Sequence, residues 1–329
     1  MKNKRLKYSV YLLVFILVGS FVMGMKKQET NTVKPIPKVG VLQFVSHPSL
    51  DLIYKGFVEE LERQDYKDKE TINIDFQNGQ ADQSKLSSMS QQLIGKKPDV
   101  LVGIATPAAQ ALANQTKDIP IILGAISDPK AAGLVESNNK PGGNITGVSD
   151  QSPVEAQLKL MKQLMPNIKT VGVIYSSAED NSLSQVNRFK EIAEKEGIEV
   201  KTYAVPSTNE ISQMTHVMTG EVEAIYTPTD NTIANGFQTI VSIADEANIP
   251  IFPSVDTMVE EGGVATIGIN QYDLGVQTAK MVVGTLTGKI IPSDTPIYTF
   301  NTGDLVINEE KAQKLGITIP KELKEEAKK

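Results

Sequence analysis

The sequence predicts an α/β protein with two doubly wound lobes, and three observations support this fold class. From Lys38 onward, short apolar runs alternate with amphipathic segments at helical spacing, a pattern typical of parallel sheets with right-handed crossovers. Residues 99–129 and 223–256 share one plan of strand, Thr-Pro, helix, Ile-Pro-Ile strand and Asp-containing turn. The chain has 329 residues, 40% of them hydrophobic, which is enough for two cores. We therefore expect two Rossmann-like lobes.

The N-terminal segment, residues 1–37, is expected to be an export signal or membrane anchor followed by a linker. Four basic residues precede an uncharged, mostly apolar run from Tyr8 to Met25, and two lysines close it. This is the pattern of an export signal, and a run of about 18 residues also reaches the lower limit for a membrane span. Cleavage and retention as an anchor both stay open. Lipid attachment is excluded, because Met25 stands where a lipoprotein has a cysteine.

The first lobe is expected to span residues 38–148. The run VGVLQFV, residues 39–45, has the continuous apolar character of a strand buried on both faces. Apolar residues then recur at helical spacing over residues 50–61. The same patterns predict further strands at 71–77, 99–105, 119–126 and 143–149, and helices at 84–98 and 108–115.

The second lobe is expected to span residues 149–270, where the alternation starts again. The patterns predict strands at 170–176, 199–205, 223–228, 249–255 and 264–270, and helices at 155–166, 182–197, 209–220 and up to residue 248. A helix over 272–288 and then a strand and a helix form a C-terminal tail. Periodicity does not assign this tail to either lobe.

The composition excludes several kinds of site. The chain has no Cys, so it has no disulfide, thiolate nucleophile or cysteine-based metal site. It has only two His residues and no G-x-S-x-G, G-x-G-x-x-G or phosphate-loop motif in the required context. Residues 1–27 carry six positive charges and no negative one, so with a formal net charge of −6 the remainder carries −12. Such an acidic body is a poor match for nucleic acid. We expect no catalytic residue, metal, cofactor or nucleic-acid partner.

Polar residues follow the predicted strands at their carboxyl ends, where open parallel sheets bind ligands. Several of these turns open a helix, whose unpaired N–H groups attract a carboxylate or phosphate, whereas the Asp residues suit a cationic group. A site with both kinds of group suits a zwitterion. The candidate ligand-binding residues are Phe44, Ser46, His47, Thr106, Pro107, Ala108, Ser127, Asp128, Tyr175, Asn181, Ser182, Asp230, Asn231, Asp256 and Asn270.

Each of these turns also has a plainer interpretation, because Ser, Thr, Asp and Asn are preferred helix N-caps in any protein. The functional interpretation depends on both lobes having such turns at the same predicted edge. Asp230 is the strongest candidate, because three more polar residues stand directly beside it and a plain cap needs only one. His47 is either a base or a polar residue at the cleft edge. Phe44 and Tyr175 are either core residues or walls for a ligand side chain.

Several motifs connect the chain to a known family. It contains, in this order, GVLQFVSHPSLDLIYKGFVEEL, ATPAAQALAN, ISDPKAAGLV, GGNITGVSD, VGVIYSSAEDNS, YTPTDNTI and YDLGVQTA. From about Val39 to Ile319 the chain resembles the solute-binding proteins of a bacterial ABC importer family. These are type I periplasmic-binding-protein-like, and their group is associated with tryptophan and other aromatic amino acids.

The resemblance implies a clamp of two lobes with a hinge and an interlobe cleft, and three strands that cross between the lobes. It implies that residues from about 271 to 292 return to the first lobe and residues from about 293 to 325 to the second. It also implies an exported, extracytoplasmic monomer, held at the membrane through its N-terminal segment or released. Such a protein delivers its ligand to an ABC permease and its ATPase.

We therefore expect a solute-binding protein for a free amino acid, aromatic and with tryptophan favoured. The ligand carboxylate is assigned to helix-start N–H groups and hydroxyls at Thr106, Ala108, Ser127 and Ser182. The ammonium is assigned to Asp230, with Asn231 or Asp128 assisting, and Phe44, His47 and Tyr175 are candidate walls for the ligand side chain. Two other classes stay open. An enzyme on the same fold needs an acid–base pair in the cleft, and a ligand-sensing domain of a receptor or regulator needs an output or DNA-binding domain.

Overall fold

The computed structural model describes residues 35–327 and eight residues of the N-terminal segment, namely Asn3, Lys7, Tyr8, Val10, Tyr11, Leu13, Val14 and Ile16. The chain divides into two compact units, residues 1–35 and residues 36–329. Among the described residues, no helix is both long and apolar enough to cross a membrane. The predicted export segment falls largely outside the described residues. Both predicted lobes lie within the second unit.

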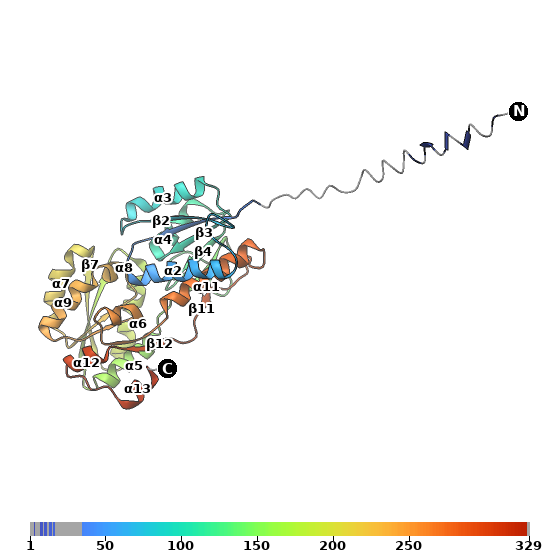
Figure 1. Cartoon of the computed structure of the whole chain (residues 1–329). Coiled ribbons are helices and arrows are strands. Elements are labelled where there is room, and N and C mark those ends of the chain that lie inside the picture. The colour runs from blue at the N-terminus through green and yellow to red at the C-terminus, as the bar shows by residue number, and fades with distance from the viewer. Residues whose placement is uncertain are drawn as a thin grey trace. The chain divides into compact units, whose positions relative to one another are not determined.

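The first lobe is built on a six-stranded parallel sheet in the order β11-β5-β4-β3-β1-β2 (Figure 1). Its strands are β1 (Lys38–Gln43), β2 (Asn73–Asn78), β3 (Val100–Ile104), β4 (Ile121–Gly124), β5 (Ile145–Ser149) and β11 (Tyr298–Thr299). Helix α2 (Pro48–Arg63) packs on α11 (Gln271–Leu286), and α3 (Gln83–Gly95) packs on α4 (Thr106–Gln115). The central strands β3, β4 and β5 are fully buried, as the continuous apolar runs of β3 and β4 predict.

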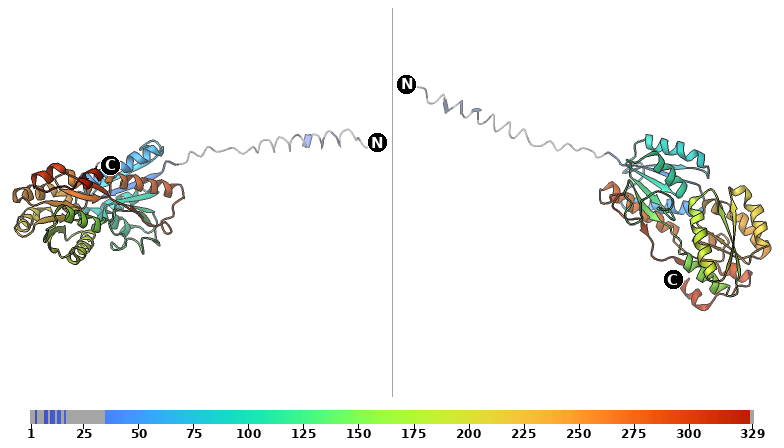
Figure 2. Two further views of the ribbon diagram at one scale, coloured as in Figure 1. Left: turned by 90° about the horizontal axis from the view of Figure 1, so that it is seen from below. Right: turned by 180° about the vertical axis from the view of Figure 1, so that it is seen from behind.

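The second lobe is built on a four-stranded parallel sheet in the order β7-β6-β8-β9, seen from a second side in Figure 2. Its strands are β6 (Thr170–Ser176), β7 (Glu199–Val205), β8 (Ala224–Thr227) and β9 (Ile251–Pro253). Helix α5 (Val154–Leu164) packs on α6 (Asp180–Lys195), and α7 (Ile211–Thr219) packs on α9 (Phe237–Ala247). Three shorter helical elements complete these connections: η1 (Thr208–Glu210), α8 (Asn231–Asn235) and α10 (Asp256–Glu260).

One pair of strands departs from the parallel pattern. Strand β10 (Ala265–Gly268) pairs antiparallel with β12 (Asp304–Ile307) in a separate two-stranded sheet. Helices α12 (Glu309–Lys314) and α13 (Lys321–Glu326) follow, and their buried residues Ala312 and Leu323 belong to the second lobe's core. The alternation of strands and helices therefore predicts the two main sheets. It does not predict the pairing of β12 with β10, because α11 and β11 lie between these two strands in the sequence.

The chain passes between the lobes three times. The first passage follows β5, the second joins β10 to α11, and the third joins β11 to β12. The resemblance implies a final return to the second lobe at about residue 293, whereas in the structure this return follows Thr299, because β11 pairs with β5 in the first lobe. Three connections at one boundary form the hinge that the resemblance implies.

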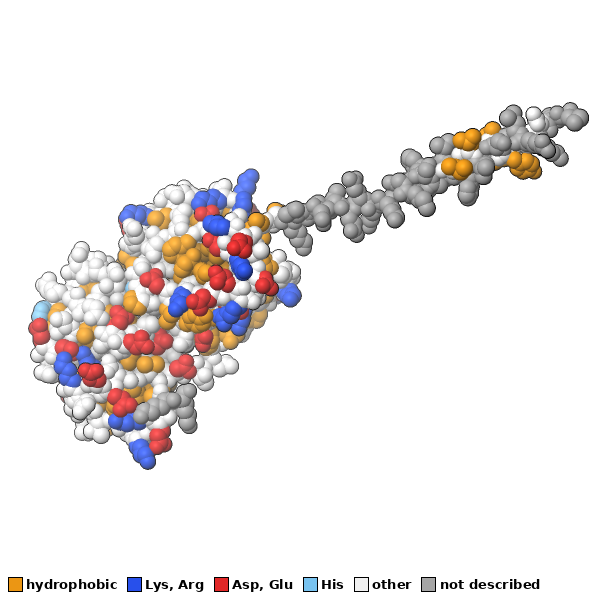
Figure 3. All heavy atoms as spheres, in the orientation of Figure 1, with side chains coloured by type: hydrophobic (Ala, Val, Ile, Leu, Met, Phe, Trp, Pro, Cys, Tyr) orange, Lys and Arg blue, Asp and Glu red, His pale blue; other side chains and the backbone are white. Residues whose placement is uncertain are grey.

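The surface charges of the second unit are mixed. On the face shown in Figure 3, acidic and basic side chains are interspersed over both lobes, and that face has no basic stripe. A nucleic-acid-binding domain typically gathers Lys and Arg on one face. The visible face therefore gives no support to a nucleic-acid partner.

Candidate ligand-binding site

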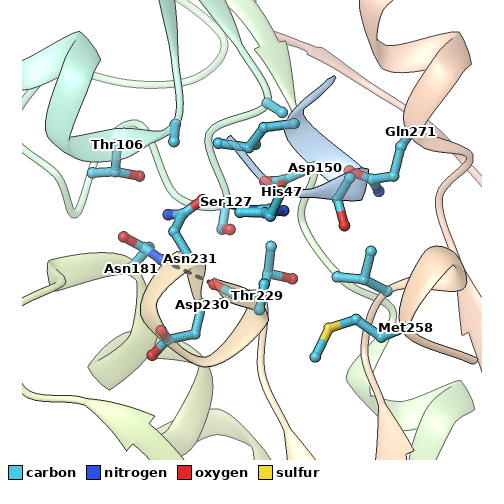
Figure 4. Close-up of a pocket in the computed structure, with 16 residues that line it drawn as sticks. His47, Thr106, Ser127, Asp150, Asn181, Thr229, Asp230, Asn231, Met258 and Gln271 are labelled. Atoms are coloured by element: carbon cyan, nitrogen blue, oxygen red, sulfur yellow. Dashed lines mark hydrogen bonds between the residues drawn. The ribbon is translucent and has the colours of Figure 1, made fainter. Parts of the chain in front are cut away.

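A cavity lies between the two lobes at the carboxyl ends of their strands (Figure 4). Both lobes and the passages between them line it, which is the position that open parallel sheets use for ligands. The lining residues are His47, Ser49, Leu50, Ala105, Thr106, Ala125, Ser127, Asp150, Asn181, Thr229, Asp230, Asn231, Ala234, Val255, Met258 and Gln271. No Lys or Arg is among these lining residues of the described chain.

Two lining residues of the first lobe have an unusual backbone. Ala105 follows β3 with φ of 73°, and Ala125 follows β4 with φ of 62°. A residue with a Cβ rarely adopts this left-handed region, and the conformation costs about 1–2 kcal/mol. Such strain gathers at functional sites, where the surrounding fold holds it. In this protein the positive φ values of Ala105 and Ala125 turn the chain sharply at the ends of β3 and β4. Thr106 and Ser127, which follow these turns, both line the cavity.

Asp150 is a carboxylate of the cavity with one oxygen that has no partner among the described residues. It lies just after β5, in the first passage between the lobes, and only 6% of its surface is exposed. Its Oδ1 is fully buried and accepts no hydrogen bond from any described residue. Burial raises the pKa of the Asp150 carboxyl to about 6, against the opposite effect of hydrogen bonds from the Ser127 side chain and from its own backbone. A buried, unpaired carboxylate oxygen is costly, and a cationic ligand group would relieve this cost.

Asp230 has a different environment, because protein donors already occupy both of its oxygens. Oδ1 accepts from the backbone N–H of Ile233 at 2.9 Å and so caps α8. Oδ2 accepts from the backbone N–H of Ser176 at 2.6 Å and from the Ser182 hydroxyl at 2.7 Å. In Figure 4 its side chain points away from the other labelled residues. Burial, and then the charge of Glu179, raise the pKa of Asp230 well above its ordinary value.

Glu179 holds the start of α8 from the neighbouring β6–α6 connection. One oxygen accepts from the Thr232 backbone N–H and hydroxyl, both at 2.8 Å. The other accepts from the side-chain amide of Asn231 at 2.5 Å and from its backbone N–H at 3.3 Å. This buried carboxylate therefore fixes which way the Asn231 amide points, and the free N–H groups at the start of a helix favour the negative charge.

Hydrogen bonds join the two lobes across and beside the cavity. Within the cavity lining, His47 Nε2 lies 3.4 Å from Asn231 Oδ1. The hydroxyl of the lining residue Ser49 lies 2.6 Å from that of Thr257. Outside these pairs, the donors are three glutamine amides: Gln185 donates to the Ser127 hydroxyl, Gln83 to the Ala178 carbonyl and Gln110 to an Asp180 carboxylate oxygen, at 3.0, 2.7 and 2.9 Å. The two lobes are therefore in a closed arrangement.

The remaining sequence candidates lie in other environments. Phe44 is buried in the core of the first lobe, and Tyr175 packs against the core of the second lobe. Several polar candidates hold local turns or caps: Ser46 donates to Asp51, Asp128 accepts from the Ala131 N–H, Ser182 donates to Asp230, Asp256 accepts from the Thr257 N–H and Asn270 caps α11. Pro107 and Ala108 are buried in the first turn of α4. The cavity brings together His47, Thr106, Ser127, Asn181, Asp230 and Asn231.

Several lining residues are not among the sequence candidates. Asp150 follows a predicted strand, but it falls at the junction of the predicted lobes, and only a search for polar residues at that junction would have found it. Leu50, Val255 and Met258 look like core residues in the sequence. Ala105 and Ala125 carry no sequence signal, because alanine does not normally mark a left-handed turn.

Two similar α/β lobes, three connections between them and a polar cavity closed from both sides define a two-lobed binding protein for a small solute. The family model described as "ABC transporter substrate binding protein" matches residues 38–329, and the chain belongs to this family. It is a substrate-binding protein of an ABC transporter, and the family is one of binding proteins rather than enzymes.

Relatives with known ligands are similar over most of the chain. A tyrosine-binding protein of Clostridioides difficile (strain R20291) is 39% identical, over 84% of this chain and 80% of its own length. The structure of an ABC domain from Streptococcus pneumonia in complex with L-Trp is 56% identical, with a TM-score of 0.86, over 88% of this chain and 98% of that chain.

A third relative informs the arrangement of the lobes. A ligand-free, open structure of a substrate-binding protein with adhesive properties from Clostridium difficile is 40% identical over 87% of this chain and 97% of that chain, with a TM-score of only 0.68. The higher similarity to the L-Trp complex agrees with the hydrogen bonds that join the lobes in this structure.

Proposed function

We propose that this substrate-binding protein captures a free aromatic amino acid, with tryptophan favoured, and delivers it to an ABC permease and its ATPase. The observation that carries this proposal is the unpartnered carboxylate oxygen of Asp150 in the interlobe cavity, which is where an α-ammonium group would be neutralised. The relatives named as binding tyrosine and L-Trp support an aromatic side chain.

The lining residues divide into groups that suit the three parts of such a ligand. Asp150 is assigned the ammonium, because its Oδ1 is free and, among the described residues, no Lys or Arg lines the cavity. The Thr106 hydroxyl and the first N–H groups of α4 are assigned the carboxylate, since helix starts attract anions. Leu50, Val255 and Met258 supply apolar contacts for the aromatic ring. Asp230 remains the alternative ammonium partner that the sequence favours.

The N-terminal sequence supports an extracytoplasmic location for this function. Its basic residues and apolar run have the pattern of an export segment, which would carry the binding lobes out of the cytoplasm and, if retained, hold them at the membrane. We propose that the protein acts as a monomer, because each chain contains both halves of its own cavity.

A thermal-shift screen of the full-length protein against the amino acids tests this function. A ligand at 100 times its dissociation constant adds about 2.7 kcal/mol to the free energy of unfolding, which raises the melting temperature measurably. We expect tryptophan, and to a lesser extent tyrosine, to give this shift. If neither shifts the melting temperature while another solute does, the aromatic assignment is wrong.

Isothermal titration calorimetry of Asp150→Asn tests the ammonium assignment. Loss of the charge-assisted hydrogen bond is expected to weaken tryptophan binding by at least about 10-fold. Asp118→Asn, on the exposed loop before β4, is a matched control that makes the same exchange away from the cavity. Equal affinities for the two variants would contradict the assignment.

A further inference from the structure

His47 has a polar ring atom without a partner in the part of the chain that the structure describes. The residue lies at the N-cap of α2, is 7% exposed and lines the cavity. Its Nδ1 is fully buried without a hydrogen-bond partner among the described residues, and the same holds for Oδ1 of two other lining residues, Asp150 and Asn181. Buried polar atoms are rarely left unpaired, and unpaired atoms gathered at one cavity point to the polar groups of its ligand.

The hydrogen bonds around His47 decide whether Nδ1 is a donor or an acceptor. Glu179 is acceptor-only when ionised, so the Asn231 group that contacts it at 2.5 Å is the amide NH₂. The carbonyl oxygen of Asn231 therefore faces His47 Nε2 at 3.4 Å. In neutral imidazole, an Nε2–H that donates to this oxygen leaves Nδ1 as a lone-pair acceptor. The contacts of Glu179 and Asn231 therefore favour the His47 tautomer with the proton on Nε2.

The surroundings keep the imidazole neutral. Burial lowers the pKa of His47, and the opposite effects of the Asn231 hydrogen bond and of the Glu179 and Asp51 charges are smaller. Both of these carboxylates have other partners. Glu179 holds the start of α8, and Asp51 accepts from Gln43 and Ser46. His47 therefore offers a neutral acceptor rather than a positive charge.

We propose that His47 determines side-chain specificity by accepting a hydrogen bond at Nδ1 from the ring N–H or hydroxyl of the bound aromatic amino acid, with Asn231 and Glu179 as positioning residues. This inference depends on the proposed function. Asp150 takes the charged ammonium, and the neutral ring acceptor of His47 takes the neutral side-chain donor. When an analogue without that donor is bound, the acceptor stays buried and unpaired. The site therefore discriminates strongly against such an analogue.

Ligand pairs that differ in one donor test this inference. Tryptophan is compared with its benzothiophene analogue, in which sulfur replaces the indole N–H, and tyrosine with phenylalanine. For each pair whose donor-containing member binds, calorimetry on the full-length protein is expected to show at least about 10-fold weaker binding of the donor-free member. In His47→Phe this ratio is expected to fall to about 1. In His216→Phe, the same exchange on the exposed face of α7, the ratio is expected to be retained.

The outcomes separate this inference from the proposed function. If no aromatic amino acid binds, the proposed function is wrong and this inference with it. If tryptophan binds and its benzothiophene analogue binds equally well, only the role of His47 is wrong. A ratio that persists in His47→Phe also overturns it. So does a His47→Phe variant that loses affinity for tryptophan and its analogue by the same factor, because His47 then serves a part that both ligands share.

A measurement on the unmodified protein covers the case in which His47→Phe does not fold. The chain has only two histidines, so nitrogen-15 NMR of the histidine-labelled protein resolves both rings. With tryptophan bound at neutral pH, His47 is expected to be the neutral tautomer with the proton on Nε2, and its Nδ1 shift is expected to differ between tryptophan and the benzothiophene analogue. A proton on Nδ1, or identical Nδ1 shifts, overturns the inference.

Discussion

At the scale of single residues, hydrogen-bond partners distinguish the two buried aspartates of the cavity. Three protein donors engage Asp230, whereas Asp150 keeps one oxygen free. An aspartate that caps a helix and also joins two neighbouring segments has little capacity left for a ligand. These partners favour Asp150 for the ammonium and a structural role for Asp230.

Two substitutions at Asp230 separate the structural role from the binding role. Asp230→Ala removes the cap of α8 and the acceptor for Ser176 and Ser182, so the free energy of unfolding is expected to fall by about 2–4 kcal/mol. Asp230→Asn keeps one acceptor, and its tryptophan affinity is expected to change much less than that of Asp150→Asn. Chemical denaturation and calorimetry measure the two effects. A larger loss of affinity in Asp230→Asn than in Asp150→Asn would identify Asp230, rather than Asp150, as the partner of the ligand ammonium.

The pH dependence of binding provides a second test of Asp150. Its pKa in the ligand-free protein is raised to about 6, and only the ionised carboxylate attracts an ammonium. Affinity is therefore expected to be constant well above this pH and to fall as the pH decreases through about 6, by close to 10-fold per pH unit below it. Calorimetry from pH 8 to pH 5 measures this slope, and Asp150→Asn should remove it.

The same pKa shift has a consequence for stability. Because the folded-state pKa of Asp150 lies above the ordinary value of 3.8, its ionisation stabilises the unfolded state more than the folded state. The contribution is fully present below the unfolded pKa and is lost as the pH rises through about 6. The ligand-free Asp150→Asn variant is therefore expected to melt no lower than the parent protein at pH 7.5, even though it binds more weakly.

At the scale of the elements, the contact between α2 and α11 aligns two sides of the cavity. Helix α2 begins beside His47 and carries Leu50, and α11 begins with Gln271. A Cβ on Gly275 would lie 1.9 Å from the Ile53 carbonyl oxygen, and one on Gly56 would lie 2.2 Å from that of Tyr272. Both glycines are therefore needed for the two helix backbones to approach this closely.

Gly275→Ala is expected to force α2 and α11 apart. The free energy of unfolding should fall by about 1–3 kcal/mol, as for other overpacked sites, and tryptophan affinity should also fall because the cavity residues of both helices move. Gly95→Ala, in the last position of α3 with nothing within 4 Å of the added Cβ, is the matched control. Equal melting temperatures for the two variants would show that the helices tolerate the added methyl group.

At the scale of the whole molecule, part of the closed arrangement is held by contacts outside the cavity. Gln83 and Gln110 of the first lobe donate to Ala178 and Asp180 at the start of α6 in the second. Neither glutamine lines the cavity. These contacts stabilise the closed state whichever ligand is present. The apparent affinity of a ligand that binds only the closed state is proportional to the population of that state.

The double variant Gln83→Ala/Gln110→Ala is expected to shift the ligand-free protein toward an open state. The affinities for tryptophan and tyrosine should fall by the same factor, about 5-fold or more, since neither side chain contacts the ligand. Small-angle X-ray scattering should show a larger ligand-free radius of gyration. Gln91→Ala, whose amide bonds within the first lobe, controls for the loss of a surface glutamine. Different factors for the two ligands would contradict a role in closure alone.

The sequence predicts the elements of both lobes well because their signals are local. Continuous apolar runs mark the buried strands, and helical spacing marks the helices that cover them. The predictions are less complete where distant segments meet. The helix expected up to residue 248 is two helices, α8 and α9, separated at Gly236, where a Cβ would lie 2.4 Å from the Ile211 side chain. The pairing of β11 with β5 also depends on segments 150 residues apart, since Tyr298 pairs with Val148.

The sequence by itself determined the two-lobed α/β architecture and the edge of the sheets at which polar side chains gather, because both follow from the order of strands and helices. Only the tertiary structure decided which carboxylate stays free. Donors from Ser176 and Ser182, about 50 positions earlier in the chain, occupy one carboxylate oxygen of Asp230. Asp150 keeps one buried oxygen without a partner among the described residues. The capacity of a buried carboxylate to bind a ligand depends on the donors that folding brings to it, and those donors have no fixed spacing in the sequence.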